Sequence, residues 1–79
     1  MKVRVLFFGA TAAAAGTNTL ELNLDDRSNT GQVYDDLLER FPELSRHRLL
    51  FAVNQEYASR STPLNAGDEL AVFTAVSGG

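Results

Sequence analysis

The sequence of 79 residues is long enough for one small domain, and its 44% hydrophobic and 22% charged residues are typical of a globular fold. The absence of cysteine excludes a disulfide framework, a thiolate nucleophile and a cysteine-based metal site. A formal net charge of −3 with seven basic residues argues against a surface that binds nucleic acid. No apolar segment approaches the roughly 20 residues of a membrane span.

The first residues are predicted to form a strand over residues 2–8. Val3, Val5 and Phe7 alternate with the intervening side chains, as in a strand with one buried face. The same start, MKVRVLFFGATAAAAG, also combines basic residues, an apolar stretch and alanines in the manner of a secretory signal peptide. Because its removal would take several of the largest apolar side chains from a small domain, we interpret it as part of the fold and expect a cytoplasmic protein.

Two further elements are predicted before the middle of the chain. The run ATAAAAG favours a short helical turn, which Gly16 can close in the left-handed conformation. The run TLELNL then places Leu20, Leu22 and Leu24 on one face, which predicts a half-buried strand antiparallel to the first.

A helix is predicted after the polar segment DDRSNTG. Asn29 and Gln32 have the spacing of a capping box, in which each side chain accepts a hydrogen bond from the backbone of the other. Apolar side chains then recur at helical intervals, namely Val33, Tyr34, Leu37, Leu38, Phe41 and Leu44. Pro42 lacks an N–H and crowds the preceding turn, so the regular helix should end near Phe41.

The last part of the chain is predicted to hold three strands. The run LLFAVNQEYA predicts a strand, a tight turn near Asn54-Gln55 and a short return strand. A loop around Pro63 and a turn at residues 66–68 lead to a final strand over residues 69–74.

The order strand, strand, helix and three strands predicts an α+β domain, with a mixed sheet of four to five strands packed on one main helix. We expect a single domain over residues 1–79, with a flexible tail at residues 75–79.

The outward faces of the strands carry apolar side chains where polar ones are expected. If the first strand buries Val3, Val5 and Phe7, then Leu6 and Phe8 point away from the core. The last strand would bury Leu70 and Val72 and leave two residues outward, Ala71 and Phe73. Such a surface predicts a docking site for a partner. The alternatives are that the alternation is shifted by one residue or that a second layer covers this face.

Side-chain catalysis has no strong candidate. The single histidine, His47, lies in a polar stretch without convergent partners, which is typical of a surface histidine. Asp35, Asp36 and Glu39 fall on the polar side of the predicted helix, where a solvated face is the ordinary interpretation.

The chain ends on Gly78-Gly79, and a frayed terminus is the ordinary interpretation of such an ending. However, an unhindered glycine pair can thread a narrow channel and present its terminal carboxylate to a remote active site. This carboxylate is an anion at neutral pH and a poor electrophile, so a partner would have to activate it with ATP. Attack of sulfide or a persulfide on the resulting acyl-adenylate would yield a thiocarboxylate.

Four runs together resemble a known family: MKVRVLFFG, VYDDLLERFPEL, FAVNQEYA and TPLNAGDELAVFTAVSGG. They are similar to the small subunit of molybdopterin synthase and, more broadly, to the sulfur carrier of the thiamine pathway. The resemblance covers essentially the whole chain and implies a ubiquitin-like β-grasp fold. The sequence departs from the family at Thr74-Ala75, where many synthase subunits carry two prolines.

The resemblance also implies a set of site residues. Gly79 would carry the carboxylate that becomes a thiocarboxylate, with Gly78 before it. The positions that match the partner-binding surface of the family are Phe8, Tyr57 and Phe73, followed by the tail residues Ala75, Val76 and Ser77.

The implied partners carry the chemistry. An adenylating enzyme related to ubiquitin-activating enzymes would use ATP and Mg²⁺, and a sulfurtransferase would supply sulfur. The thiocarboxylate would then enter the large synthase subunit, in a heterotetramer of two small and two large subunits, and donate sulfur to cyclic pyranopterin monophosphate. The chain itself would bind neither a cofactor nor a metal.

Three alternatives stay open at this point. The chain could carry sulfur for thiamine, cysteine or tRNA thiolation, since these carriers share the fold. It could be a ubiquitin-like modifier whose C-terminal glycine forms isopeptide bonds. It could also be an interaction domain with an inert tail.

Overall fold

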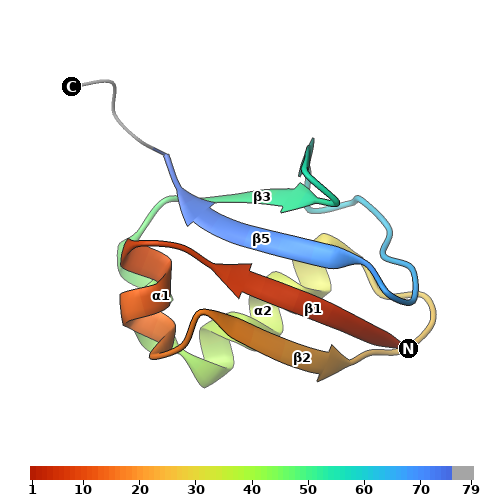
Figure 1. Cartoon of the computed structure of the whole chain (residues 1–79), viewed down its shortest axis with the longest axis horizontal. Helices are drawn as coiled ribbons and strands as arrows, with labels where there is room; N and C mark the ends of the chain where they lie inside the picture. Colours follow the sequence, from red (N-terminus) through yellow and green to blue (C-terminus); the bar gives the residue numbers. More distant parts are fainter. Residues whose placement is uncertain (76–79) are drawn as a thin grey trace.

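The computed structural model describes residues 1–75 as a sheet with a helix packed across one face (Figure 1). In chain order the elements are β1 (Lys2–Phe7), α1 (Ala10–Ala15), β2 (Thr19–Asn23), α2 (Thr30–Arg40), the 3-10 helix η1 (Pro42–Arg46), β3 (Leu49–Val53), β4 (Glu56–Ala58) and β5 (Glu69–Thr74). The α+β prediction is therefore confirmed. No helix in this part of the chain is both long and apolar enough to span a bilayer.

The sheet has five strands in the order β2-β1-β5-β3-β4. β1 pairs antiparallel with β2 and parallel with β5, while β3 pairs antiparallel with both β5 and β4. The first strand thus lies inside the sheet, and its Val3, Val5 and Phe7 are buried. This confirms the interpretation of the first residues as part of the fold.

Backbone positions with positive φ close two of the turns. Gly16 has the predicted left-handed conformation at the end of α1, with a φ of 73°, and its N–H donates to the Ala12 carbonyl. Asn54 and Gln55, with φ of 50° and 72°, form the tight turn between β3 and β4. The Asn54 side chain stabilises this uncommon conformation, because its amide donates to Asp68 at 2.9 Å and accepts from the Glu69 N–H at 3.0 Å.

The boundaries of α2 follow the predicted signals. The Asn29 side chain accepts from the Gln32 N–H at 2.9 Å, and the Gln32 side chain accepts from the Asn29 N–H at 2.8 Å, which completes the capping box. The helix ends at Arg40, with Phe41 as its C-cap, and Pro42 begins η1. A proline is favoured at a first helical position, because its missing N–H would have no partner there.

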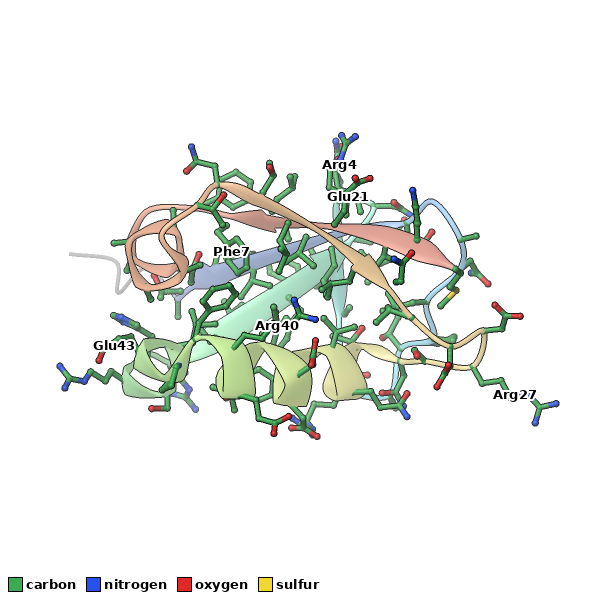
Figure 2. All side chains as sticks on the ribbon, turned by 90° about the horizontal axis from the view of Figure 1, so that it is seen from below. Arg4, Phe7, Glu21, Arg27, Arg40 and Glu43 are labelled. Carbon is green, nitrogen blue, oxygen red and sulfur yellow. The ribbon has the colours of Figure 1, made fainter. Side chains whose placement is uncertain are left out.

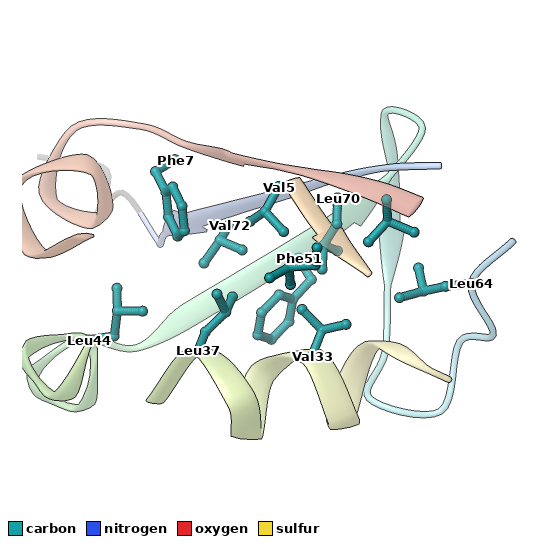
Figure 3. Packing of buried hydrophobic residues seen from close by; sticks show 11 residues of the cluster. Val5, Phe7, Val33, Leu37, Leu44, Phe51, Leu64, Leu70 and Val72 are labelled. Atoms are coloured by element: carbon teal, nitrogen blue, oxygen red, sulfur yellow. The ribbon is translucent and has the colours of Figure 1, made fainter. Parts of the chain in front are cut away.

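The core lies between α2 and the inner face of the sheet (Figure 3). Side chains from five segments meet there: Val5 and Phe7 from β1, Val33 and Leu37 from α2, Leu44 from η1, Phe51 from β3, and Leu70 and Val72 from β5. The predicted helical stripe is confirmed, with Tyr34, Leu38 and Phe41 packed at the edge of this cluster. The core therefore uses one face of the sheet, and α2 does not cover the other face (Figure 2).

Candidate functional site

The face of the sheet opposite α2 holds the predicted docking residues. Figure 2 shows α2 on one side of the sheet, while Arg4 and Glu21 project from the other side. The predicted alternation is confirmed in β5 and along β1 to the residue that follows it, because Phe7 and Val72 are buried whereas Phe8 is 52% exposed and Phe73 is partly exposed. We call this surface the outer face.

Strand register gathers the apolar side chains of the outer face at one end. Ala71 pairs with both Leu6 and Ala52, and Ala52 also pairs with Tyr57. In the next row, Phe73 pairs with Leu50, and Phe8 follows directly after the Phe7–Val72 pair. We call this group the apolar patch: Leu6, Phe8, Leu50, Ala52, Tyr57, Ala71 and Phe73.

Aromatic rings form the most accessible part of the apolar patch. Tyr57 is 81% exposed and Phe8 is 52% exposed, and they are the two large hydrophobic residues that stand out in solvent among residues 1–75. Phe73 is shielded in part by Tyr57, since their ring centroids lie 6.0 Å apart at an interplanar angle of 50°. Exposed aromatic rings beside aliphatic side chains are typical of protein-binding surfaces.

The other end of the outer face is charged. Arg4 pairs in register with Glu21 on β2 and with Glu69 on β5, and Lys2 lies two residues before it, at the start of β1. These side chains line a shallow hollow of about 220 Å³ with Val3 and Gly67. The outer face is therefore divided into an apolar end, where β1 and β5 finish, and a charged end, where they begin.

The chain leaves the sheet at the apolar end. β5 finishes at Thr74, and Ala75 is exposed. The predicted site residues Val76, Ser77, Gly78 and Gly79 lie outside the described residues, so their roles stay predictions. Four residues span at most about 14 Å when fully extended, which is the limit of reach beyond Ala75.

The structure adds residues that sequence analysis did not assign to the site. Leu50 and Ala52 join the patch from β3, and the alternation around the buried Phe51 would have placed both of them outward. The sequence predicts Thr11 only as part of a helical turn, yet its side chain is fully buried and contacts β5. No sequence pattern pointed to this contact.

The acidic side chains of α2 and His47 lie at the surface. Asp36 pairs with Arg40 at 3.1 Å, and Asp35 pairs with Arg60 at 3.2 Å. His47 lies beside Glu43 at a hollow between η1 and α1. Within residues 1–75, no three histidine or acidic side chains gather as metal ligands would.

The chain matches the ThiS family over residues 5–79. A relative in Mycobacterium tuberculosis, the molybdopterin synthase sulfur carrier subunit, is 39% identical over 82 residues, which cover 100% of this chain and 99% of the relative.

Two solved structures share the fold. The small archaeal modifier protein 1 of H. volcanii has a TM-score of 0.85 and 28% identity, with 95% of this chain and 98% of that chain covered. A chain in the complex of subunits 1 and 2 of the molybdopterin-converting factor from Helicobacter pylori has a TM-score of 0.70 and 23% identity, with 100% of both chains covered. The fold is thus the expected ubiquitin-like β-grasp. The chain belongs to the ThiS family and to the family of molybdopterin synthase sulfur carrier subunits.

Proposed function

We propose that this protein is a sulfur carrier of molybdopterin synthesis, which delivers sulfur as a thiocarboxylate on Gly79. The observation that carries the proposal is the position of the apolar patch. It lies at the end of the sheet from which β5 leads toward the Gly78-Gly79 ending. A partner that binds the patch therefore receives the chain end within a reach of about 14 Å beyond Ala75.

The proposed chemistry takes place on the Gly79 carboxylate. One carboxylate oxygen attacks the α-phosphorus of ATP, so that an acyl-adenylate forms and pyrophosphate leaves. Hydrosulfide then attacks the carbonyl carbon, the bond to the AMP oxygen breaks, and a thiocarboxylate, AMP and one proton result. Neither step needs a catalytic side chain from the carrier, which agrees with the solvated positions of Asp35 and Asp36.

The proposed partners supply the nucleotide site, the sulfur and the substrate site. An adenylating enzyme would provide the ATP and Mg²⁺ site, and a sulfurtransferase would provide the sulfur. The large synthase subunit would hold cyclic pyranopterin monophosphate and accept one sulfur from each of two carriers, in a heterotetramer. The relative named in Mycobacterium tuberculosis and the two-subunit complex from Helicobacter pylori support this assignment.

The same outer face would serve the adenylating enzyme and the large subunit in turn. Both must receive the same chain end, so a surface close to the exit of β5 suits both of them. Many synthase subunits have two prolines where this chain has Thr74-Ala75. Each of these two residues has a backbone N–H that proline lacks, and neither has the fixed φ of proline.

A second function, conjugation to lysines of other proteins, is favoured by the likeness to the small archaeal modifier protein. Both functions begin with an acyl-adenylate, so they differ in the acceptor. An immunoblot of cell lysate separates them: a ladder of heavier adducts supports a modifier, and a single small band supports a carrier.

Two variants of the chain end test the proposed site. Adding one alanine after Gly79 displaces the carboxylate, and deleting Gly79 shortens the reach by about 3.5 Å. A displacement of about 1 Å from the reactive geometry can lower a rate roughly a hundredfold. We expect both variants to fold and bind the cognate adenylating enzyme normally, while ATP–pyrophosphate exchange falls at least about a hundredfold. Near-normal exchange with either variant would show that Gly79 is not the reactive end.

A further inference from the structure

Thr11 makes a buried contact that links the end of β1 to β5, two of the four strands that carry the apolar patch. Its side chain is fully buried, although it comes from the short helix α1. The hydroxyl accepts a hydrogen bond from the Phe8 N–H at 2.9 Å and donates to the Val72 carbonyl at 2.7 Å, with the Phe8 carbonyl at 3.0 Å. One hydroxyl therefore joins backbone groups from the end of β1 and from β5.

This hydroxyl occupies a position that belongs to the strand ladder. The Arg4 N–H donates to the Asp68 carbonyl at 2.9 Å, which sets the pattern between β1 and β5. A parallel ladder repeats every second residue, so the Phe8 N–H is the donor that should reach the Val72 carbonyl. The Thr11 hydroxyl stands between these two groups instead.

The Thr11 hydroxyl supplies hydrogen-bond partners for two backbone groups where β1 ends. β1 ends at Phe7, and the chain then turns away through Gly9, whose φ is 55°. The turn removes the direct partner of the Val72 carbonyl, and a buried backbone group without a partner destabilises the fold. A threonine hydroxyl can accept and donate at once, so it can pair with both groups.

We infer that Thr11 is a positioning residue for the docking surface, on the basis of the proposed function. Phe8 is held through its own N–H, and Phe73 is held through the carbonyl of the preceding residue, Val72. Because one hydroxyl fixes both backbones, it sets the spacing of two aromatic residues of the apolar patch. Thr11 touches no substrate and acts only through Phe8 and Phe73.

The test compares three variants in ATP–pyrophosphate exchange with the cognate adenylating enzyme. Thr11→Val keeps the shape and removes the hydroxyl, whereas Thr11→Ser keeps the hydroxyl. Thr30→Val is the matched control, because the Thr30 side chain is also fully buried and donates to the Thr62 carbonyl at 3.2 Å, but it bonds neither Phe8 nor Val72. We expect Thr11→Val to raise the KM of the adenylating enzyme for the carrier about tenfold with kcat unchanged, as for a loss of binding. Thr11→Ser and Thr30→Val should keep the wild-type KM for the carrier.

A measurement on the wild-type protein keeps the inference testable if Thr11→Val does not fold. NMR should show a slowly exchanging Thr11 hydroxyl proton with a cross-peak to the Phe8 amide proton. Rapid exchange of both protons overturns the bridge, and an equal KM for Thr11→Val and Thr30→Val overturns the positioning role. A wild-type protein that is not adenylated at all contradicts the proposed function instead, and the NMR result still decides the bridge.

Discussion

Replacement of Tyr57 by alanine should weaken partner binding without destabilising the fold. A tyrosine presents roughly 200 Å² of surface, and Tyr57 is 81% exposed, so about 160 Å² is free to be buried by a partner. At roughly 25 cal/mol per Å² this is an upper limit of about 4 kcal/mol. Since an interface seldom buries a whole side chain and alanine retains its Cβ, we expect about 2 kcal/mol, or roughly a thirtyfold loss of affinity.

The assay is titration calorimetry with the cognate adenylating enzyme, with thermal unfolding measured beside it. Tyr57→Phe is the control, because it keeps the ring and its contact with Phe73 and removes only the hydroxyl. We expect Tyr57→Phe to bind within about threefold of wild type. An unchanged affinity for Tyr57→Ala would refute the assignment of the apolar patch as the docking surface. A large fall in the unfolding temperature would instead show that Tyr57 supports the sheet.

Two further substitutions test the apolar patch and the packing of α2. Phe73→Asp should lower affinity for both the adenylating enzyme and the large subunit at least about tenfold, because it places a charge beside the Tyr57 ring. Because Phe73 is partly exposed, the variant should still fold. Wild-type affinity in the folded variant would contradict the docking role of the apolar patch. Gly31→Ala should lower the unfolding temperature, because a Cβ would lie 3.0 Å from the Arg60 carbonyl oxygen, while ATP–pyrophosphate exchange at low temperature stays at wild-type level. A rise in its unfolding temperature would show that the Arg60 loop can move aside and that the helix preference of alanine prevails.

Most of the fold could be predicted from local patterns, because each pattern has a local physical cause. The capping box of Asn29 and Gln32 and the break at Pro42 depend on groups within a few residues of one another. The alternation of buried and outward side chains in β1 and β5 can also be predicted, since side chains in a strand with one buried face must alternate. Alternation alone predicts that Phe8 and Phe73 point outward, whatever the strand pairing.

Strand order and the Thr11 contact could not be predicted in this way. The parallel pairing of β1 with β5 joins residues about 65 positions apart, and no local signal specifies it. The Thr11 hydroxyl reaches Val72 only because that pairing brings α1 beside β5. The contribution of Leu50 to the patch also depends on the pairing of β3 with β5, although its outward direction follows from alternation.

The identity of the reactive group is tested most directly by intact mass spectrometry of the purified protein. The protein is incubated with its cognate adenylating enzyme, ATP, Mg²⁺ and sodium sulfide, and fragment ions locate any change along the chain. The account predicts a species in which one oxygen is replaced by sulfur, and the fragment ions should place that sulfur on Gly79. A chain that remains unmodified while the enzyme activates another carrier under the same conditions would contradict the account, as would sulfur at any other residue.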